Sequence, residues 1–190
     1  MKLSGSYQIN LEKQKVWEAL NDPEILQKTI PGCEEFIKKS ETEFTATATN
    51  KIGPFNASFT GDIELKDLNP PHSYKITGSG NSPVGFANGE ATVSLDDEDN
   101  GTKLTYTVDA NVGGKIAQVG SRLIDMTAKK MADIFFGKFS ELVSSEQDNK
   151  KIVEENSEKI KVTNEKKSQN KTLIYISIVL FAAVAVYLII

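Results

Sequence analysis

The sequence contains few residues of the types that build metal centres, disulfides and nucleophilic sites. Its 190 residues include one cysteine, Cys33, and one histidine, His72. A single cysteine allows no internal disulfide, which fits a reducing compartment. Zinc sites and Cys–His nucleophilic pairs need more of these side chains than the chain supplies. We therefore expect no metal site, no covalently bound cofactor and no catalytic residues.

Positive charge is also scarce. Lysine and arginine number 22 against 26 aspartates and glutamates, which gives a net charge of -4. Such a chain has no general attraction for a nucleic-acid backbone, so we expect no nucleic-acid partner. The first residues also lack the apolar stretch that a signal peptide requires, so we expect no export. Length and composition together favour one globular domain with an appendage.

The appendage is an uncharged, largely aliphatic run from Leu173 to Ile190. Eighteen residues of helix extend about 27 Å, close to the roughly 30 Å hydrocarbon thickness of a bilayer. A buried core helix is the alternative, but such helices are rarely apolar on every face. We predict a transmembrane tail anchor over residues 172–190. Lys166, Lys167 and Lys171 precede it, so the positive-inside rule predicts a single-pass cell-membrane protein with a cytoplasmic N-terminal domain.

A polar linker is predicted over residues 146–171. It carries six acidic residues and seven lysines and has no Trp, Tyr or Phe. Its few large aliphatic residues cannot form a core. If flexible, the linker gives a root-mean-square reach of roughly 25 to 30 Å, and partial helix would stiffen it.

Residues 1–145 show the period-two alternation of half-buried strands. From Phe55 to Lys66 apolar or small residues alternate with polar ones, and the same pattern follows Asn100 and Gly101. Similar runs predict about seven strands joined by short turns, and hence an antiparallel sheet. The other predicted strands are Lys2–Ile9, Glu34–Lys39, residues 44–48, Ser73–Gly78 and residues 91–95.

Helical periodicity occurs in two places. Lys13–Leu20 predicts a short helix, and Asp22 with Pro23 marks a new helix start. A longer amphipathic helix is predicted from about Lys115 to Ser145. One long helix against a curved antiparallel sheet is the α+β helix-grip arrangement, in which the space between helix and sheet is often a cavity.

Five segments resemble the CoxG family, the G subunit of carbon monoxide dehydrogenase, within the START-like (SRPBCC) superfamily. They are KLSG at 2–5, VWEALNDP at 16–23, IPGC at 30–33, KIGP at 51–54 and VGGKIAQVGSRLID at 112–125, the last followed by Phe135 and Phe136. The resemblance covers roughly residues 1–139. It implies a helix-grip fold and a role in bringing a cytoplasmic carbon monoxide dehydrogenase-type molybdenum hydroxylase to the membrane. Carriage of a membrane quinone has been proposed for this family.

A hydrophobic cavity between sheet and helix is therefore expected, suited to a quinone or lipid. Ordinary core packing would produce the same pattern, and the cavity is favoured by the resemblance and by the small residues Gly61, Ala91 and Ala110. Gly120 is placed on the sheet-facing side of the helix, where it would either allow close packing or open room for a ligand. The candidate ligand-binding residues are Phe59, Ile63, Ile76, Phe86, Val93, Tyr106, Val108, Gly120, Leu123, Thr127, Met131 and Phe135.

Two helix residues are candidates for docking a partner. Arg122, the only arginine, is placed away from the sheet, three residues before Asp125, so a surface ion pair is the simpler interpretation. Phe136 is also placed opposite the buried face, where it would contact a partner enzyme or lipid, or be covered by another element.

Three functions remain open at this point. The first is a membrane-anchored CoxG-like subunit that recruits a hydroxylase and carries a hydrophobic ligand. The second is a recruitment or assembly adaptor with a filled core and no ligand. The third is a small-molecule enzyme of the same superfamily, which would need an ionisable residue facing inward. The predicted strands offer Tyr106 but no inward Asp, Glu or His, so an accessory, non-enzymatic role is favoured.

Overall fold

A single antiparallel sheet of seven strands forms the body of the protein, in the order β1-β7-β6-β5-β4-β3-β2. The computed structural model describes residues 1–160, with side chains described for residues 1–145. Except for the pairing of β1 with β7, all neighbours in the sheet are consecutive in the chain, because short turns join them. The strands are β1 (Lys2–Ile9), β2 (Cys33–Lys38), β3 (Glu43–Ile52), β4 (Phe55–Asn69), β5 (Ser73–Ser82), β6 (Gly85–Glu98) and β7 (Gly101–Gly114).

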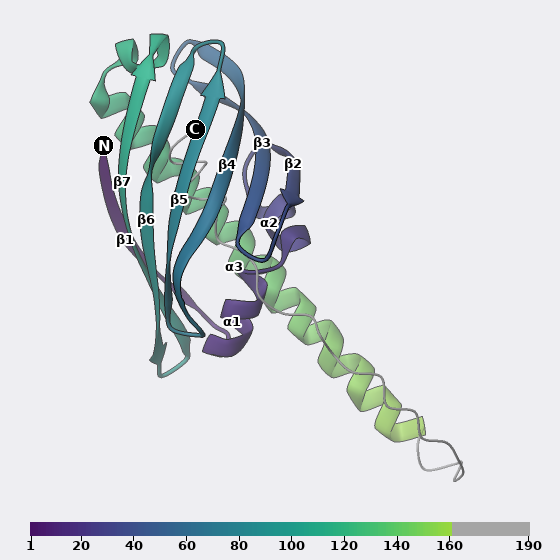
Figure 1. The fold of residues 1–190 in the computed structure, drawn as a ribbon. Coiled ribbons are helices and arrows are strands. Elements are labelled where there is room, and N and C mark those ends of the chain that lie inside the picture. The colour runs from purple at the N-terminus through teal and green to yellow at the C-terminus, as the bar shows by residue number, and fades with distance from the viewer. Residues whose placement is uncertain (161–190) are drawn as a thin grey trace.

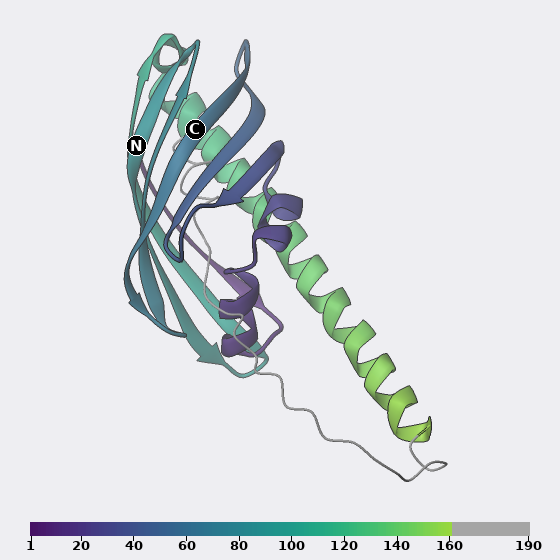
Figure 2. The same cartoon turned by 45° about the vertical axis from the view of Figure 1, so that its right-hand side comes forward.

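Helices cover one face of this sheet. The short helices α1 (Lys13–Ala19) and α2 (Pro23–Thr29) connect β1 to β2, and the Asp22 carboxylate caps α2 by accepting from the backbone N–H of Glu24 at 2.8 Å. The sheet curves around α3 (Ser121–Ile160), which crosses the concave face obliquely and extends beyond it (Figures 1 and 2). The predicted helix-grip fold with about seven strands is confirmed for this part of the chain.

The long helix differs from the prediction at both ends. A 3-10 helix, η1 (Lys115–Val119), precedes it, and Gly120 separates the two with φ 90°. The predicted single helix is broken because a φ in this region is open mainly to glycine. At the other end α3 continues from Ser145 to Ile160, into the segment predicted as a polar linker. Residues 146–160 contain neither glycine nor proline, so nothing in the sequence stops the helix.

The predicted tail anchor, residues 172–190, lies outside the described residues, as does the second part of the predicted linker. Within residues 1–160, no helix combines the length and the apolarity that crossing a bilayer requires.

Candidate functional site

The concave face of the sheet carries most of the predicted ligand-binding residues. Alternate residues of each strand point toward α3, and six of the predicted strand residues are among them, all nearly fully buried. They are Phe59, Ile63, Ile76, Val93, Tyr106 and Val108. The structure therefore brings these six together, although burial alone does not distinguish a ligand site from a core.

Two parts of the concave face differ in side-chain size. Direct pairing across β3, β4, β5 and β6 joins Ala46, Gly61, Gly80 and Ala87, and a second row joins Gly78, Gly89 and Ala110. We call these seven residues the small-residue patch. Nearer the other end of the strands, the inward residues are large and form the large-residue patch: Leu65, Tyr74, Ile76, Val93, Leu95, Leu104 and Tyr106.

On the side of α3 that faces the sheet, the side chains also become larger from the start of the helix onward. Its buried residues are Ala128 and Ala132, followed by Phe135, Phe136, Phe139 and Val143. Phe136 stacks on Tyr106, which fixes the level of this turn at the large-residue patch. Ala128 and Ala132 precede Phe136 by about 12 and 6 Å along the helix axis, toward the small-residue patch. Along the helix axis, small side chains of α3 thus lie toward the small-residue patch, and large ones lie at the level of the large-residue patch.

Phe136 contradicts its predicted exposure, because it is 2 % exposed. It stacks on Tyr7 of β1 with ring centroids 4.0 Å apart and on Tyr106 at 5.7 Å. The buried face of α3 is wide enough to include both Phe135 and Phe136, because the sheet curves around the helix. Phe136 is therefore a core residue and not a docking residue.

Beside the stacked rings of Tyr7, Tyr106 and Phe136, a series of polar contacts links β1 to α3. The Tyr7 hydroxyl donates to Asp133 Oδ1, and Lys129 forms an ion pair with the same carboxylate at 3.2 Å. Burial, followed by the bond to Asp133, raises the pKa of the Tyr7 phenol above its usual range, and burial also raises the pKa of Tyr106. The bond from Tyr7, with a smaller effect of Lys129, lowers the pKa of Asp133. Tyr106, predicted as a ligand contact, is held in this cluster.

Asp125 is the ionisable residue that the sequence interpretation missed. Its Oδ1 is buried and has no hydrogen-bond partner among the described residues. It lies three residues before Ala128 and seven before Ala132, and this helical spacing is the signal that could have placed it on the sheet side. No ion pair joins it to Arg122 among residues 1–145, and Arg122 is exposed. The predicted surface pair is wrong.

Three other predicted ligand-binding residues do not point into the space between sheet and helix. Phe86 is 41 % exposed and lies on the outer face, because the register of β6 runs without a bulge from Gly85 to Val93 and fixes its parity. Gly120 is exposed, and a Cβ there would meet no atom within 4 Å, so its role is backbone geometry rather than packing. Leu123 is 36 % exposed at the start of α3.

The remaining predicted helix residues are partly or fully buried. Thr127 is half-buried, and its hydroxyl donates to the Leu123 carbonyl at 2.8 Å. Met131 is half-buried against the core, and Phe135 is fully buried beside Phe139.

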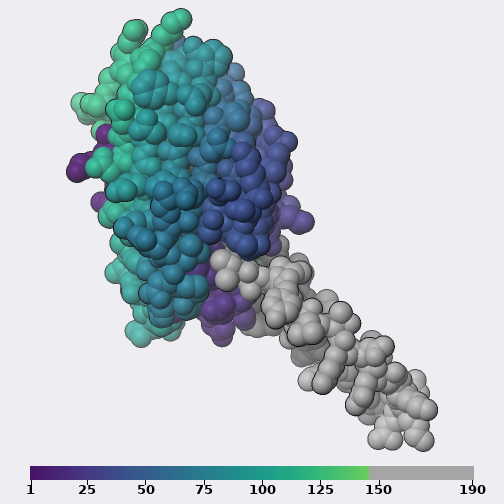
Figure 3. All heavy atoms as spheres, viewed as in Figure 1, coloured from purple at the N-terminus to yellow at the C-terminus, as the bar shows by residue number. Residues whose placement is uncertain are grey.

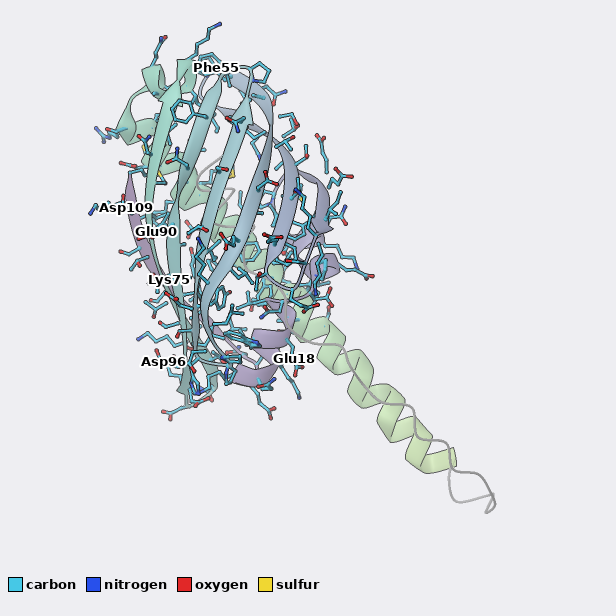
Figure 4. The ribbon with its side chains drawn as sticks, viewed as in Figure 1. Glu18, Phe55, Lys75, Glu90, Asp96 and Asp109 are labelled. Carbon is cyan, nitrogen blue, oxygen red and sulfur yellow. The ribbon has the colours of Figure 1, made fainter. Side chains whose placement is uncertain are left out.

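The outer face of the sheet, which is turned toward the viewer in Figure 3, has two shallow, polar depressions. One, of about 420 Å³, is lined mainly by polar residues that include Lys39, Asp62 and Thr77, and the other, of about 350 Å³, lies beside Glu90 and Asp109 (Figure 4). Neither suits an apolar ligand. Within residues 1–145, no three His, Cys, Asp or Glu side chains are grouped closely enough to hold a metal ion.

A curved seven-stranded antiparallel sheet gripping a C-terminal helix defines the START-like (SRPBCC) class of folds, and solved structures agree. A conserved protein from Geobacillus kaustophilus is 33% identical, with a TM-score of 0.73, and the match covers 76% of this chain and 96% of that one. A protein from Thermus thermophilus (14% identity, TM-score 0.59, 76% and 98% covered) and one from Mycobacterium smegmatis (17%, 0.58, 76% and 91%) share the fold alone.

The CoxG family, described as the G subunit of carbon monoxide dehydrogenase, matches residues 5–144. The chain therefore belongs to the CoxG family, and the predicted resemblance is confirmed. Members of this family are accessory subunits associated with carbon monoxide dehydrogenase. A search of the curated proteins finds no match.

Proposed function

We propose that this protein is a membrane-anchored accessory subunit that recruits a carbon monoxide dehydrogenase-type molybdenum hydroxylase and carries a hydrophobic ligand, such as a quinone, between bilayer and enzyme. Membership of the CoxG family supports the association with such an enzyme. The apolar run at 173–190 supports the anchor. The observation that carries the ligand proposal is the small-residue patch facing Ala128 and Ala132 of α3.

The chemistry of the patch narrows the ligand class. Its walls are apolar and offer no charge, which suits an isoprenoid or a quinone ring. Asp125 Oδ1 adds a buried acceptor without a partner. A buried acceptor is stabilised by a ligand that donates a hydrogen bond, and a reduced quinone has two hydroxyl donors whereas the oxidised form has none. We therefore expect the reduced form to bind more tightly.

The second candidate, an adaptor with a filled core, is favoured by the complete burial of the large-residue patch. Both candidates are separated by purifying residues 1–160 and measuring co-purified lipid and quinone by mass spectrometry. The match to the Geobacillus kaustophilus chain covers 96% of that chain, which supports treating this domain as a unit. Carriage predicts a bound ligand that Ala87→Trp removes, because residue 87 lies in the small-residue patch.

Phe86→Trp is the matched control, because residue 86 points to the opposite face of the same strand. A ligand lost equally in both variants would point to general destabilisation, and a wild-type domain without ligand would favour the adaptor. Flotation of the full chain with vesicles, compared with residues 1–160, tests the anchor separately. Affinity capture of a molybdenum hydroxylase through the full chain tests recruitment.

A further inference from the structure

Partly exposed apolar side chains gather at one end of the domain, where three connections meet. Three of the four exposed large hydrophobic residues of the described chain are here: Phe86 at 41 %, Leu123 at 36 % and Met126 at 61 %. The connections are residues 51–56, 82–86 and 112–126, and we call their surface the apolar tip. Its other partly or fully exposed apolar residues include Ile52, Pro54, Phe55, Pro83, Val84 and Val119.

Direct contacts make the apolar tip one continuous surface. A Cβ at Gly53, in the β3–β4 turn, would lie 3.1 Å from Leu123 and 3.3 Å from Val119, so this turn abuts the start of α3. The backbone N–H of Ile116 donates to the Val84 carbonyl at 2.9 Å, which joins η1 to the β5–β6 turn. Figure 4 shows Phe55 at this end of the sheet and Asp96 and Glu18 at the other.

The apolar tip also differs from the rest of the domain in its net charge. The three connections carry three basic residues, Lys51, Lys115 and Arg122, and one acidic residue, Asp125, whereas the rest of residues 1–145 carries 12 basic and 19 acidic residues. The three basic side chains are exposed, and none forms an ion pair within residues 1–145. The turn at the opposite end contains Asp96, Asp97, Glu98 and Asp99 in succession. The apolar tip is therefore a positive end of a negative domain.

We propose that the apolar tip docks on a lipid bilayer that contains anionic lipid. Met126, Leu123 and Phe55 would enter the boundary between headgroups and acyl chains, while Lys51, Lys115 and Arg122 meet lipid phosphates. The proposal rests on the proposed function in one respect. A lipid-soluble ligand can pass between protein and bilayer without entering water only if the end of the domain next to its site contacts the bilayer. The small-residue patch lies next to the apolar tip, at the same ends of β4, β5 and β6.

The direction of α3 constrains the docked orientation. The helix starts at the apolar tip and runs about 60 Å away from it, given 40 residues. The 11 residues between Ile160 and the predicted anchor extend to at most about 40 Å. Tip and anchor can therefore meet one bilayer only when α3 is inclined at less than about 42° to the membrane plane, since 40 Å must cover the height of Ile160 above the bilayer.

Site-specific quenching in vesicles tests this orientation. Cys33 is the only cysteine, so the full chain with Cys33→Ser accepts one reporter at a time. An environment-sensitive fluorophore is attached at Met126→Cys or Pro54→Cys in the apolar tip, or at Asp99→Cys at the opposite end as the matched control. The vesicles contain phosphatidylcholine with about 30 % phosphatidylglycerol and a doxyl-lipid quencher.

We expect at least twofold quenching at both tip positions and less than about 10 % at residue 99. Each basic residue at an anionic surface contributes roughly a fivefold change in binding, so Lys115→Glu with Arg122→Glu should reverse most of the tip quenching, as should pure phosphatidylcholine. Circular dichroism of each variant confirms folding. Equal quenching at residues 126 and 99, or none at either tip position, overturns the proposal and would indicate that this surface binds a protein partner instead.

The same reporters on residues 1–160, added to vesicles, separate this proposal from the proposed function. Tip quenching without the anchor, in a protein that carries no ligand, would overturn ligand carriage and support docking. A bound ligand and an inserted anchor without tip quenching would overturn docking alone.

Discussion

The two patches of the concave face are packed differently, although the same sheet and the same helix form both. In the large-residue patch, aromatic and branched side chains fill the space between β-strands and α3, and Phe135, Phe136 and Phe139 complete the packing. In the small-residue patch, alanine and glycine occupy both the sheet and the facing turns of α3. The first arrangement secures the helix, and the second places little side-chain volume between sheet and helix. Substitutions in the large-residue patch should therefore mainly lower the stability of the fold, whereas substitutions in the small-residue patch should mainly weaken ligand binding.

The largest effect should come from Phe139→Ala, which removes a fully buried ring on the helix side facing the sheet. Truncation of a buried Phe typically costs about 3 to 5 kcal/mol, as lost transfer energy plus the cavity left behind. Urea unfolding of residues 1–160 measures this loss. Phe86→Ala, at an exposed ring, is the control and should change the free energy of unfolding by less than about 1 kcal/mol. Comparable losses in both variants would contradict the role of Phe139 as a core residue that packs α3 in the large-residue patch.

A smaller effect is expected for Tyr7→Phe, which keeps the ring stack on Phe136 and removes the hydrogen bond to Asp133. The loss should be about 1 kcal/mol at pH 7. The pKa of Asp133 is lowered in the folded protein, so this bond stabilises the fold above the ordinary pKa of an aspartate, about 3.9, and its contribution declines as the pH falls through the lowered value.

Wild-type and Tyr7→Phe stabilities should therefore converge as the pH falls below the ordinary aspartate pKa of about 3.9 and through the lowered pKa of Asp133, as measured by urea unfolding across pH. Lys129→Met tests the cause. It removes the weaker, exposed ion pair and should change the pH dependence less than Tyr7→Phe does. A pH-independent difference between wild type and Tyr7→Phe would contradict the role of Asp133.

The smallest effect on stability should follow Ala87→Leu, in the small-residue patch. Adding three carbons to a packed core usually costs about 1 to 3 kcal/mol, whereas an open site accepts them for less than about 1 kcal/mol. We expect the smaller cost together with weaker binding of a short-chain hydroquinone, followed by titration calorimetry. Val93→Phe, a similar enlargement in the large-residue patch, is the control and should be clearly destabilising.

The alternation of apolar and polar residues was enough to predict all seven strands and the inward direction of Phe59 and Ile76. It failed for Phe86, because β6 has no bulge between Gly85 and Val93, so Phe86 has the opposite parity to Val93 and points to the outer face. Phe136 was misplaced because a periodicity of 100° per residue assumes a narrow buried stripe, while a curved sheet buries a wider one. Asp125 was paired with Arg122 by sequence spacing alone, although its buried oxygen depends on tertiary packing.

The position of Gly120 marks the start of α3 but does not make it a hinge. It is the single residue between η1 and the helix, its backbone has φ 90°, and its surroundings within 4 Å of a Cβ are empty. A rigid rotation of α3 by about 10° at this residue would nevertheless move Phe139, about 28 Å along the axis, by about 5 Å and so remove its ring from the core. The helix is therefore clamped by its buried rings, and any displacement of Ile160 must come from bending beyond Val143.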